Sequence, residues 1–534
     1  MKKNFLIITF LSSTILLGSC TKDLDLTPTN TITSAVAYST PQGLKTNLAK
    51  LYGSYSLIGS FGTGTSDLSI EGLPDNDQAN TDFVRVNFNL QELTTDNAIC
   101  AWNSGELQTL HGLNWVPNNG FLIAAYARSI YQITVCNEFL RQTTSDKIAS
   151  YNYDAATLEN LRHYRAEARF LRAFQYWVLM DLFGNPPFIT ENDPIGKFLP
   201  PQIKRAELFV YIEKELTEMN DDLVAPKQNE YARADQGAAW ALLARIYINA
   251  KVYTGVEKNT EAITYAQRVI DAGYQLKDGT NGYKKLFMSD NDQNNPEIIL
   301  PIAYDALRTQ NYGGTTFLIN SATSNTSDKN APRGIPGGGW LGNRATKNLP
   351  LAFGDYSGLN DKRAIFGDGT LDVADPIAFD NGLKVNKFTN LSSTGTTPPS
   401  QNGTLCSTDF PLFRLAEMYL IYAEAVVRNG SGGTMSKALE YMNLLRSRAY
   451  ENNTNGFTTL TLDNILNERQ REMYWENCRR TDLIRFGKFT SSTYLWSWKG
   501  GVKDGKGVAD TRNLFPIPSA DILSNPNLKQ NTGY

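Results

Sequence analysis

Apolar side chains recur every three to four residues along several stretches of this chain, which is the spacing of one buried face on an α-helix. One stripe closes at Gly273, a residue type that commonly ends helices, and an alanine-rich stripe precedes it. Their members are Ala262, Tyr265, Ala266, Val269 and Ile270, and Ala238, Ala241, Leu242, Arg245 and Ile246. Small residues let helices approach closely, so the pattern predicts an antiparallel helix pair over about 235–273.

The same helical pattern predicts two further pairs. Stripes in 161–182 and 205–223 indicate a pair over about 161–223, and stripes on both sides of the glycine-rich turn 429–433 indicate one over about 413–449. Dispersed pairs of this kind are typical of tetratricopeptide-type packing. We therefore expect a mainly α-helical fold.

Two long regions lack this periodicity. They span about 60–118 and 303–407, and both are rich in Gly, Asn, Thr, Ser and Asp but also hold aromatic residues. Long loops inside a folded chain usually carry function, so we expect ordered loops that face a ligand. The run Gly337 to Gly339 lies in the second region, but no Lys-Ser/Thr follows it and it is not a phosphate loop.

The N-terminus has the form of an export signal. A basic start leads into the apolar run 5–17, which ends at Gly18-Ser19-Cys20 and is too short to span a bilayer. Small residues before a cysteine are typical of bacterial lipoproteins, so we expect residues 1–19 to be removed and Cys20 to be lipidated. An ordinary secretory signal with a chance cysteine is the alternative. The remainder, 20–534, is expected to form a single domain.

Charge and cysteine usage narrow the class of protein. The net charge is −3 with no basic stripe, so a nucleic-acid partner is not expected. Four cysteines besides Cys20 are widely spaced and form no CxxC motif, which favours buried free thiols over zinc ligands, while three disulfide pairings stay open. They are Cys100, Cys136, Cys406 and Cys478.

Catalytic and cofactor motifs are sparse. With only His111 and His163, the chain has little room for a Ser/His/Asp triad or a poly-histidine metal site, and each histidine is expected to be structural or solvated. The segment 290–294 resembles the start of a calcium loop but lacks the glycine and glutamate that follow in such loops. We expect no cofactor and no metal.

Several segments carry a family resemblance. The sequence 167–173, Glu-Ala-Arg-Phe-Leu-Arg-Ala, and the turn 183–187, Phe-Gly-Asn-Pro-Pro, are similar to the signature helix and turn of the SusD/RagB family of surface glycan-binding lipoproteins. Further matching segments are 233–247, 413–425, 468–485, 515–518 and 530–534. Charged residues in these segments, such as Glu468 with Arg471 and Glu476 with Arg480, are expected to form partly buried ion pairs rather than a catalytic site.

The resemblance implies a SusD-like fold and a binding subunit without enzymatic activity. Such proteins cover a SusC-like TonB-dependent transporter in the outer membrane, capture oligosaccharides and deliver them for import. Aromatic rings stack on sugar faces while polar side chains bond the hydroxyl groups. By resemblance to the starch-binding member, an α-glucan is the first expectation, with Trp115 and Phe317 as weaker site candidates. The main ligand-binding candidates are Asp77, Arg85, Trp102, Asn103, Tyr312 and Trp340.

Two other classes stay open at this point. A surface glycoside hydrolase would need two carboxylates across a cleft, and the spacing of Asp and Glu singles out no pair. The second is a protein that captures peptides or glycoprotein glycans, because RagB-like relatives serve peptide importers. Ligand chemistry separates both from a polysaccharide binder.

Overall fold

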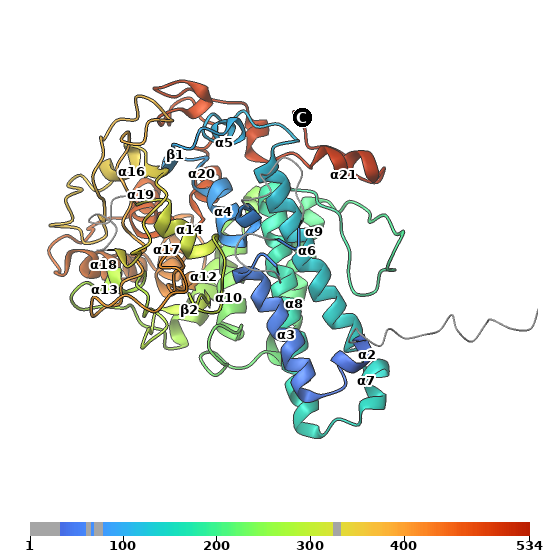
Figure 1. The fold of residues 1–534 in the computed structure, drawn as a ribbon. Coiled ribbons are helices and arrows are strands. Elements are labelled where there is room, and N and C mark those ends of the chain that lie inside the picture. The colour runs from blue at the N-terminus through green and yellow to red at the C-terminus, as the bar shows by residue number, and fades with distance from the viewer. Residues whose placement is uncertain (1–32, 60–65, 69–77, 324–332) are drawn as a thin grey trace, which may run out of the picture.

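The computed structural model describes residues 33–59, 66–68, 78–323 and 333–534; Cys20 and Asp77 lie outside them. Helices dominate the described chain, and the strands form two short antiparallel sheets (Figure 1). This confirms the mainly helical fold expected from the apolar periodicity. Within the described ranges, no helix is both long enough and apolar enough to cross a bilayer.

Long helices from the first half of the chain lie side by side (Figure 1): α3 (Pro41–Ser56), α6 (Gly120–Gln142), α8 (Ala155–Phe183) and α9 (Arg205–Glu218). Local chemistry sets where they begin. The Thr40 hydroxyl accepts the Gly43 N–H at the start of α3, with Pro41 in the first turn, and Asp154 caps α8 through the Thr157 N–H. From Ala166 to its end α8 is buried almost throughout, so it is the central helix of this layer.

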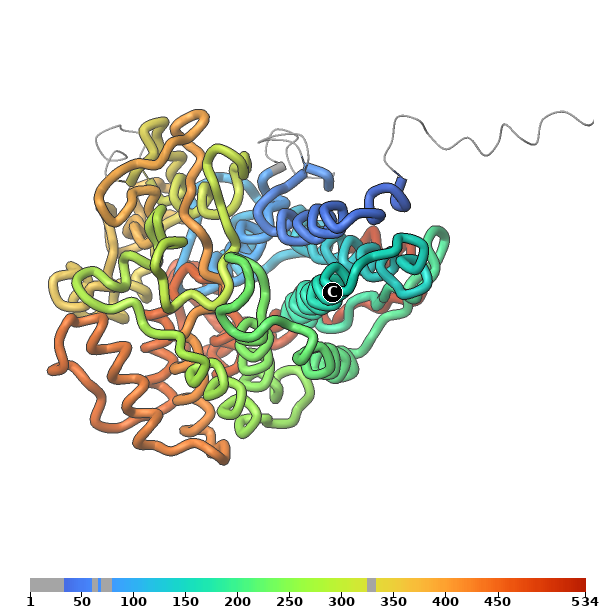
Figure 2. Tube along the Cα trace, turned by 90° about the horizontal axis from the view of Figure 1, so that it is seen from below, coloured from blue at the N-terminus to red at the C-terminus, as the bar shows by residue number. Residues whose placement is uncertain are grey.

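A second group of helices continues the stack: α10 (Gln236–Ile248), α12 (Asn259–Asp271), α17 (Leu415–Val427) and α18 (Met435–Tyr450). Each packs on the next in this order, and Figure 2 shows α17 and α18 in orange beside the green helices. Gly273 follows α12 with φ of 82°, the left-handed conformation that favours glycine after a helix. Helices α8 and α9, α10 and α12, and α17 and α18 are therefore neighbouring pairs.

The other helices are shorter. They are α2 (Ser34–Ala37), α4 (Phe83–Gln91), α5 (Gly105–His111), α7 (Ser145–Ile148), α11 (Ala250–Thr254), α13 (Gly282–Lys285), α14 (Gly314–Asn320), α16 (Asn348–Leu351), α19 (Leu462–Met473), α20 (Arg479–Arg485) and α21 (Ser519–Ser524). Several of them, including the buried α4, lie in the regions whose composition indicated irregular loops.

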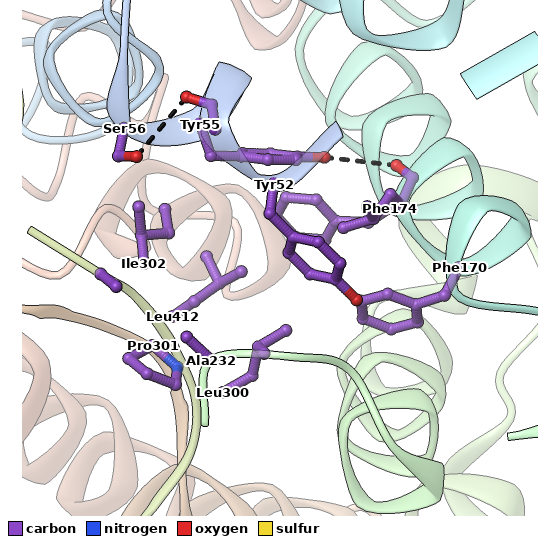
Figure 3. A pocket seen from close by; sticks show the side chains of 13 residues that line it. Tyr52, Tyr55, Ser56, Phe170, Phe174, Ala232, Leu300, Pro301, Ile302 and Leu412 are labelled. Carbon is purple, nitrogen blue, oxygen red and sulfur yellow. Dashed lines mark hydrogen bonds between the residues drawn. The ribbon is translucent and has the colours of Figure 1, made fainter. Parts of the chain in front are cut away.

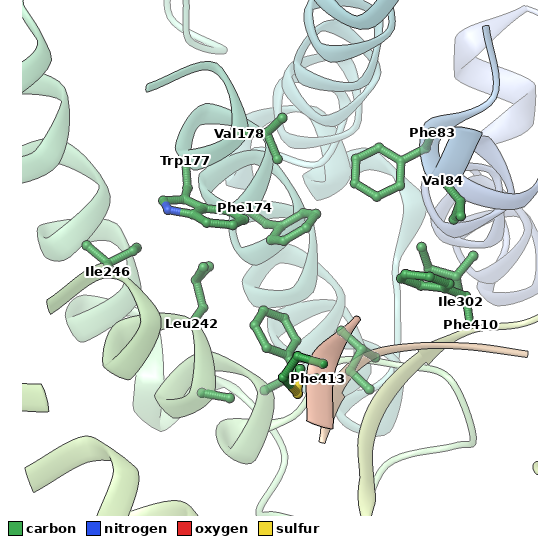
Figure 4. Close-up of a cluster of buried hydrophobic side chains, with 14 of the residues drawn as sticks. Phe83, Val84, Phe174, Trp177, Val178, Leu242, Ile246, Ile302, Phe410 and Phe413 are labelled. Atoms are coloured by element: carbon green, nitrogen blue, oxygen red, sulfur yellow. The ribbon is translucent and has the colours of Figure 1, made fainter. Parts of the chain in front are cut away.

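Apolar side chains from distant segments meet where α4, α8 and α10 approach the sheet of β2 (Ile298–Ile302) and β4 (Phe410–Arg414). Figure 4 shows Phe83, Phe174, Leu242, Ile302 and Phe413 converging at this junction, and each is at least nine-tenths buried. Burial of an aromatic or branched side chain of this size stabilises a fold by about 1.5–3 kcal/mol. The junction joins both groups of helices into one core.

Buried ion pairs tie the C-terminal helices to β4. The Arg414 guanidinium contacts Glu297, Glu472 and Glu476 at 3.0, 2.6 and 2.7 Å, and Glu468 pairs with Arg471 at 2.6 Å. The expected pair of Glu476 with Arg480 is wrong. Helix α19 ends at Met473 and α20 begins at Arg479, so these two residues do not share a helix face. Arg480 instead donates to the backbone carbonyls of Arg512 and Asn513.

The cysteines and histidines have structural surroundings. All four described cysteines are free thiols, and Cys478 alone is partly exposed. His111 is buried, its Nε2 accepts the Cys100 N–H at 3.1 Å, and burial lowers its pKa to about 3. His163 Nδ1 lies 2.7 Å from the Asp222 carbonyl oxygen. These contacts agree with the expected structural role of both histidines.

Candidate functional site

A surface cavity of about 370 Å³ brings together four of the six residues singled out in the sequence. Its lining consists of Arg85, Trp102, Tyr312, Trp340 and Thr404. Arg85 comes from α4, Trp102 follows β1 (Ala98–Cys100), and Tyr312 precedes α14. Helices α4 and α14 lie next to each other (Figure 1). The volume lies in the range of about 300–1,000 Å³ that is usual for ligand sites.

The aromatic rings of the cavity are inclined to one another. The Tyr312 and Trp340 rings are 5.9 Å apart at 84°, and Trp102 lies 6.1 Å from Phe317 at 61°. The Arg85 guanidinium lies over the Phe317 ring at 4.6 Å and over Trp102 at 5.7 Å, distances at which a cation is attracted to a ring face. Phe317 is 1% exposed, so it supports the cavity from below instead of lining it.

A two-stranded ladder fixes the two tryptophans relative to each other. Strand β1 pairs antiparallel with β3 (Asn343–Ala345), with Cys100 opposite Asn343. The Ala101 N–H donates to the Gly342 carbonyl at 2.9 Å, so pairing continues by one step beyond the strands. Because the strands are antiparallel, Trp102 and Trp340 leave the ladder at the same end.

Asn320, the last residue of α14, holds two walls of the cavity. Its backbone carbonyl accepts the Trp340 N–H at 2.8 Å, and its side-chain Nδ2 donates to the Thr404 carbonyl at 3.0 Å. The side chain is fully buried. The loop that carries Trp340 and the segment that carries Thr404 are therefore both anchored to α14.

Asp82 joins the helix that carries Arg85 to the loop that carries Tyr312. Its carboxylate caps α4 by accepting the Arg85 N–H at 2.9 Å, and it also accepts the Gly314 N–H at 2.7 Å and the Asn311 Nδ2–H at 2.6 Å. Burial raises the pKa of Asp82, and these hydrogen bonds oppose that rise. Asp82 was not anticipated from the sequence, although an Asp directly before an apolar helix is a recognisable cap signal.

The remaining sequence candidates have other surroundings. Asn103 is exposed next to Trp102 and does not line the cavity. Trp115 is buried against Phe515, and its indole N–H donates to the Tyr534 hydroxyl at 2.7 Å, so it packs the C-terminus and is no part of the site. Thr404 was not anticipated, because nothing distinguishes one threonine in a region rich in threonine.

Two other cavities have less suitable chemistry for a polar ligand. One, of about 110 Å³, is enclosed largely by apolar side chains such as Phe170, Phe174, Ile302 and Leu412 (Figure 3). Hydroxyl groups buried there would go largely unpaired, which is costly. A polar groove of about 970 Å³ runs along α18, but its tyrosines, Tyr274 and Tyr419, are only 7% and 8% exposed and offer little ring face for stacking.

The chemistry of the 370 Å³ cavity is that of a binding site. Among the described residues that line it, Arg85 alone is charged, and no carboxylate pair is present. The indole N–H groups of Trp102 and Trp340 make no hydrogen bond to the described part of the protein. Within the same ranges, no group of three His, Cys, Asp or Glu side chains is placed to hold a metal ion.

A helical protein with an open, aromatic, nearly uncharged depression belongs to the class of small-ligand binding proteins. Sequence comparison specifies the family. The SusD family model matches residues 357–534, and the model described as "Starch-binding associating with outer membrane" matches residues 72–248. The chain is 36% identical to the starch-binding protein SusD of Bacteroides thetaiotaomicron, over 97% of this chain and 96% of that protein. The protein therefore belongs to the SusD family.

Solved structures agree on the fold. A surface glycan-binding protein A from Bacteroides thetaiotaomicron, in complex with laminarihexaose, superposes with a TM-score of 0.67 at 18% identity, over 92% of this chain and 99% of that chain. A laminarin-binding SusD-like protein superposes with a TM-score of 0.69 at 21% identity, over 92% and 99%. At these identities, the likeness establishes the SusD fold.

Proposed function

We propose that this protein captures a glycan at the cell surface through the Trp102, Tyr312 and Trp340 cavity and delivers it to a TonB-dependent outer-membrane transporter. A starch-like α-glucan is the first expected ligand. The relative that is 36% identical over nearly the full length is named a starch-binding protein, which supports that choice. The laminarin-binding relatives make a β-glucan the second choice.

The convergence of three rings and one guanidinium carries the proposal. Sugar rings present flat C–H faces that pack on aromatic rings, and their hydroxyl groups bond polar side chains at the edges. Because the Tyr312 and Trp340 rings are nearly perpendicular, one sugar unit cannot stack on both faces. Successive units of a chain that turns, as an α-1,4-linked glucan does, meet this arrangement better than a flat ribbon.

Binding without hydrolysis is the expected activity. A glycosidase uses two carboxyl groups about 5–10 Å apart on either side of the scissile bond. The described lining of the cavity supplies one guanidinium, one threonine hydroxyl and three aromatic side chains. These groups can hold a sugar but cannot act as the paired acid and base.

Affinity electrophoresis tests the proposal. The form spanning residues 21–534 is run through native gels that contain starch, pullulan, dextran, laminarin, levan, xylan or mannan. We expect retardation by starch and pullulan, and loss of retardation in Trp340→Ala and Trp102→Ala. Each ring should be worth about 1–3 kcal/mol if stacking on sugars resembles stacking on bases.

A matched control tests whether loss of binding is specific to the cavity or follows from removing any exposed aromatic side chain. Tyr356 is 37% exposed and outside the cavity, so Tyr356→Ala should migrate like the native protein in every gel. Retardation by laminarin alone would support glycan capture but would identify a β-glucan, not an α-glucan, as the ligand. No retardation by any polymer, with no binding of short oligosaccharides, would refute glycan capture and favour a peptide ligand.

Anchoring and delivery are tested in cells. If Cys20 carries the lipid, labelled fatty acid should appear on the native protein, and Cys20→Ala should abolish the label. Deleting the partner transporter should leave the protein on the surface but stop import of its glycan. Import that persists without the transporter would contradict the delivery step.

A further inference from the structure

A short turn, residues 402–404, adds Thr404 to one wall of the cavity and was not singled out in the sequence. The Asn402 side-chain oxygen accepts the backbone N–H groups of Thr404 and Leu405 at 3.0 and 3.2 Å. Only the oxygen of an amide can accept these two bonds, so the contacts fix which way the amide faces. The Asn402 NH₂ group must therefore point away from the turn.

The NH₂ group of Asn402 reaches the phenol of Tyr312. Nδ2 donates to Tyr312 Oη at 3.2 Å, and the described part of the protein offers the phenol no second partner. A phenol that accepts one hydrogen bond keeps its own proton for another acceptor. Tyr312 is thus presented to the cavity as a hydrogen-bond donor.

Thr404 lines the same cavity. Its hydroxyl makes no hydrogen bond within the described chain, while its backbone carbonyl is held by Asn320 Nδ2. A hydroxyl in this state can both donate and accept. The wall therefore offers a ligand one oriented donor and one adaptable partner.

We infer that Asn402 is a positioning residue that makes Tyr312 a donor to an acceptor oxygen of the bound glycan, while Thr404 bonds a neighbouring sugar hydroxyl. This inference rests on the proposed function. A ring or glycosidic ether oxygen can only accept, so an oriented donor suits it. Specificity at this wall then depends on which acceptor oxygen a given linkage brings to Tyr312.

Asn402→Asp tests the inference because it replaces the NH₂ group that donates to Tyr312 with an oxygen that can only accept. One carboxylate oxygen can still accept the two turn N–H groups, but the other replaces the donor that faces Tyr312. The phenol then donates to the carboxylate and is lost to the glycan. Gln401→Glu is the matched control, because it adds the same charge one residue away, where Gln401 contacts the Leu307 carbonyl and not Tyr312.

Calorimetric titration with maltoheptaose and with laminarihexaose gives the readout. We expect Asn402→Asp to weaken binding by about two- to tenfold, the range for one hydrogen bond, and Tyr312→Phe to match it. The double variant should bind no more weakly than either single variant, because both remove the same bond. Thr404→Val should weaken binding independently, and Gln401→Glu should bind like the native protein.

The outcomes separate this inference from the proposed function. Native affinity in Asn402→Asp, an equal loss in Gln401→Glu, or additive losses in the double variant would overturn the inference while glycan capture stands. A crystal structure of the native protein in which Asn402 does not face Tyr312 would also overturn it. If the native protein binds no glycan, the proposed function fails first and this role fails with it.

Discussion

The α-carbon of Gly342 faces the indole of Trp102, and a β-carbon at this position would stand 2.6 Å from Nε1. The φ angle of Gly342 is 132°, a conformation that side-chain-bearing residues rarely adopt. Its carbonyl also accepts the Ala101 N–H, so strand pairing holds it in place. The position of Trp102 in the cavity therefore depends on the absence of a side chain at residue 342.

Gly342→Ala should reduce glycan binding by about fivefold or more, because the added methyl group displaces a ring that contributes about 1–3 kcal/mol. Affinity electrophoresis and the near-ultraviolet circular dichroism of tryptophan measure the change. Gly395 also has positive φ, 81°, but nothing lies within 4 Å of its β-position. Gly395→Ala should bind normally, and native binding by Gly342→Ala would contradict the prediction.

Asp82→Asn should lower both stability and affinity. The substituted amide turns an NH₂ group toward the Asn311 NH₂ group, where the carboxylate now accepts a bond of 2.6 Å. An unmatched buried donor costs about 1–3 kcal/mol. Urea unfolding and glycan titration measure the two effects.

Asp154→Asn is the control for the cap itself. Asp154 caps α8 far from the cavity, and asparagine caps helices as well as aspartate does. This variant should keep native stability and affinity. If Asp82→Asn behaves the same way, Asp82 does not join α4 to the Tyr312 loop as described.

Acid should destabilise the protein through the buried glutamates that are paired with arginines. Burial alone would raise the pKa of Glu468, but Arg363, Arg471 and Arg446 outweigh it and lower the pKa from 4.5 to about 2. The folded state then binds fewer protons than the unfolded state, so the stability from Glu468 is present above pH 4.5 and is lost as pH falls toward 2. The urea midpoint should therefore be lower at pH 3 than at pH 4.5.

Glu468→Gln should lower stability at pH 7 by about 3–5 kcal/mol, since it leaves buried guanidinium groups without their partner. The variant's free energy of unfolding should also fall less steeply below pH 4.5, because one titrating group is gone. Glu440→Gln, at a glutamate that is 53% exposed, should change neither quantity. A Glu468→Gln curve parallel to the native curve would show that Glu468 is not a titrating contributor.

The thiols should be unreactive in the folded protein. Burial raises the pKa of Cys100, Cys136 and Cys406 to about 12, and burial also raises the pKa of Cys478 well above its usual value. Since the thiolate is the nucleophile, a disulfide reagent at pH 8 should react slowly with the native 21–534 form. In guanidinium without reductant, four thiols should react. A lower count would indicate a disulfide.

The aromatic part of the cavity could be predicted because aromatic residues stand out in the two polar loop regions and their order resembles that in the SusD family. Trp102 and Trp340 converge because β1 and β3 pair, a contact between segments more than 200 residues apart that neither segment signals alone. Asn103 was chosen because an asparagine also follows a tryptophan in the family resemblance, but neighbouring residues point in different directions in an extended chain, and only Trp102 lines the cavity.

The polar supports of the site could not be read from the sequence. Asp82, Asn320 and Asn402 act through bonds to loops that are distant in the chain, and the sequence contains many similar residues whose bonds are local. Helical segments were easier to predict from the sequence, because apolar periodicity is repeated over many residues and tolerates local exceptions. Where a helix breaks, as between α19 and α20, the same periodicity paired Glu476 with the wrong arginine.

The β1 and β3 ladder also limits how ligand preference can be altered. A slip of one residue would shift one tryptophan along the other by about 3.3 Å and turn alternate side chains to the opposite face. A loop taken from a relative with another preference would bring its own strand register. Residues 98–104 and 337–345 must therefore be exchanged as one unit, and libraries that vary only one of these segments will mostly lose the site before they change it.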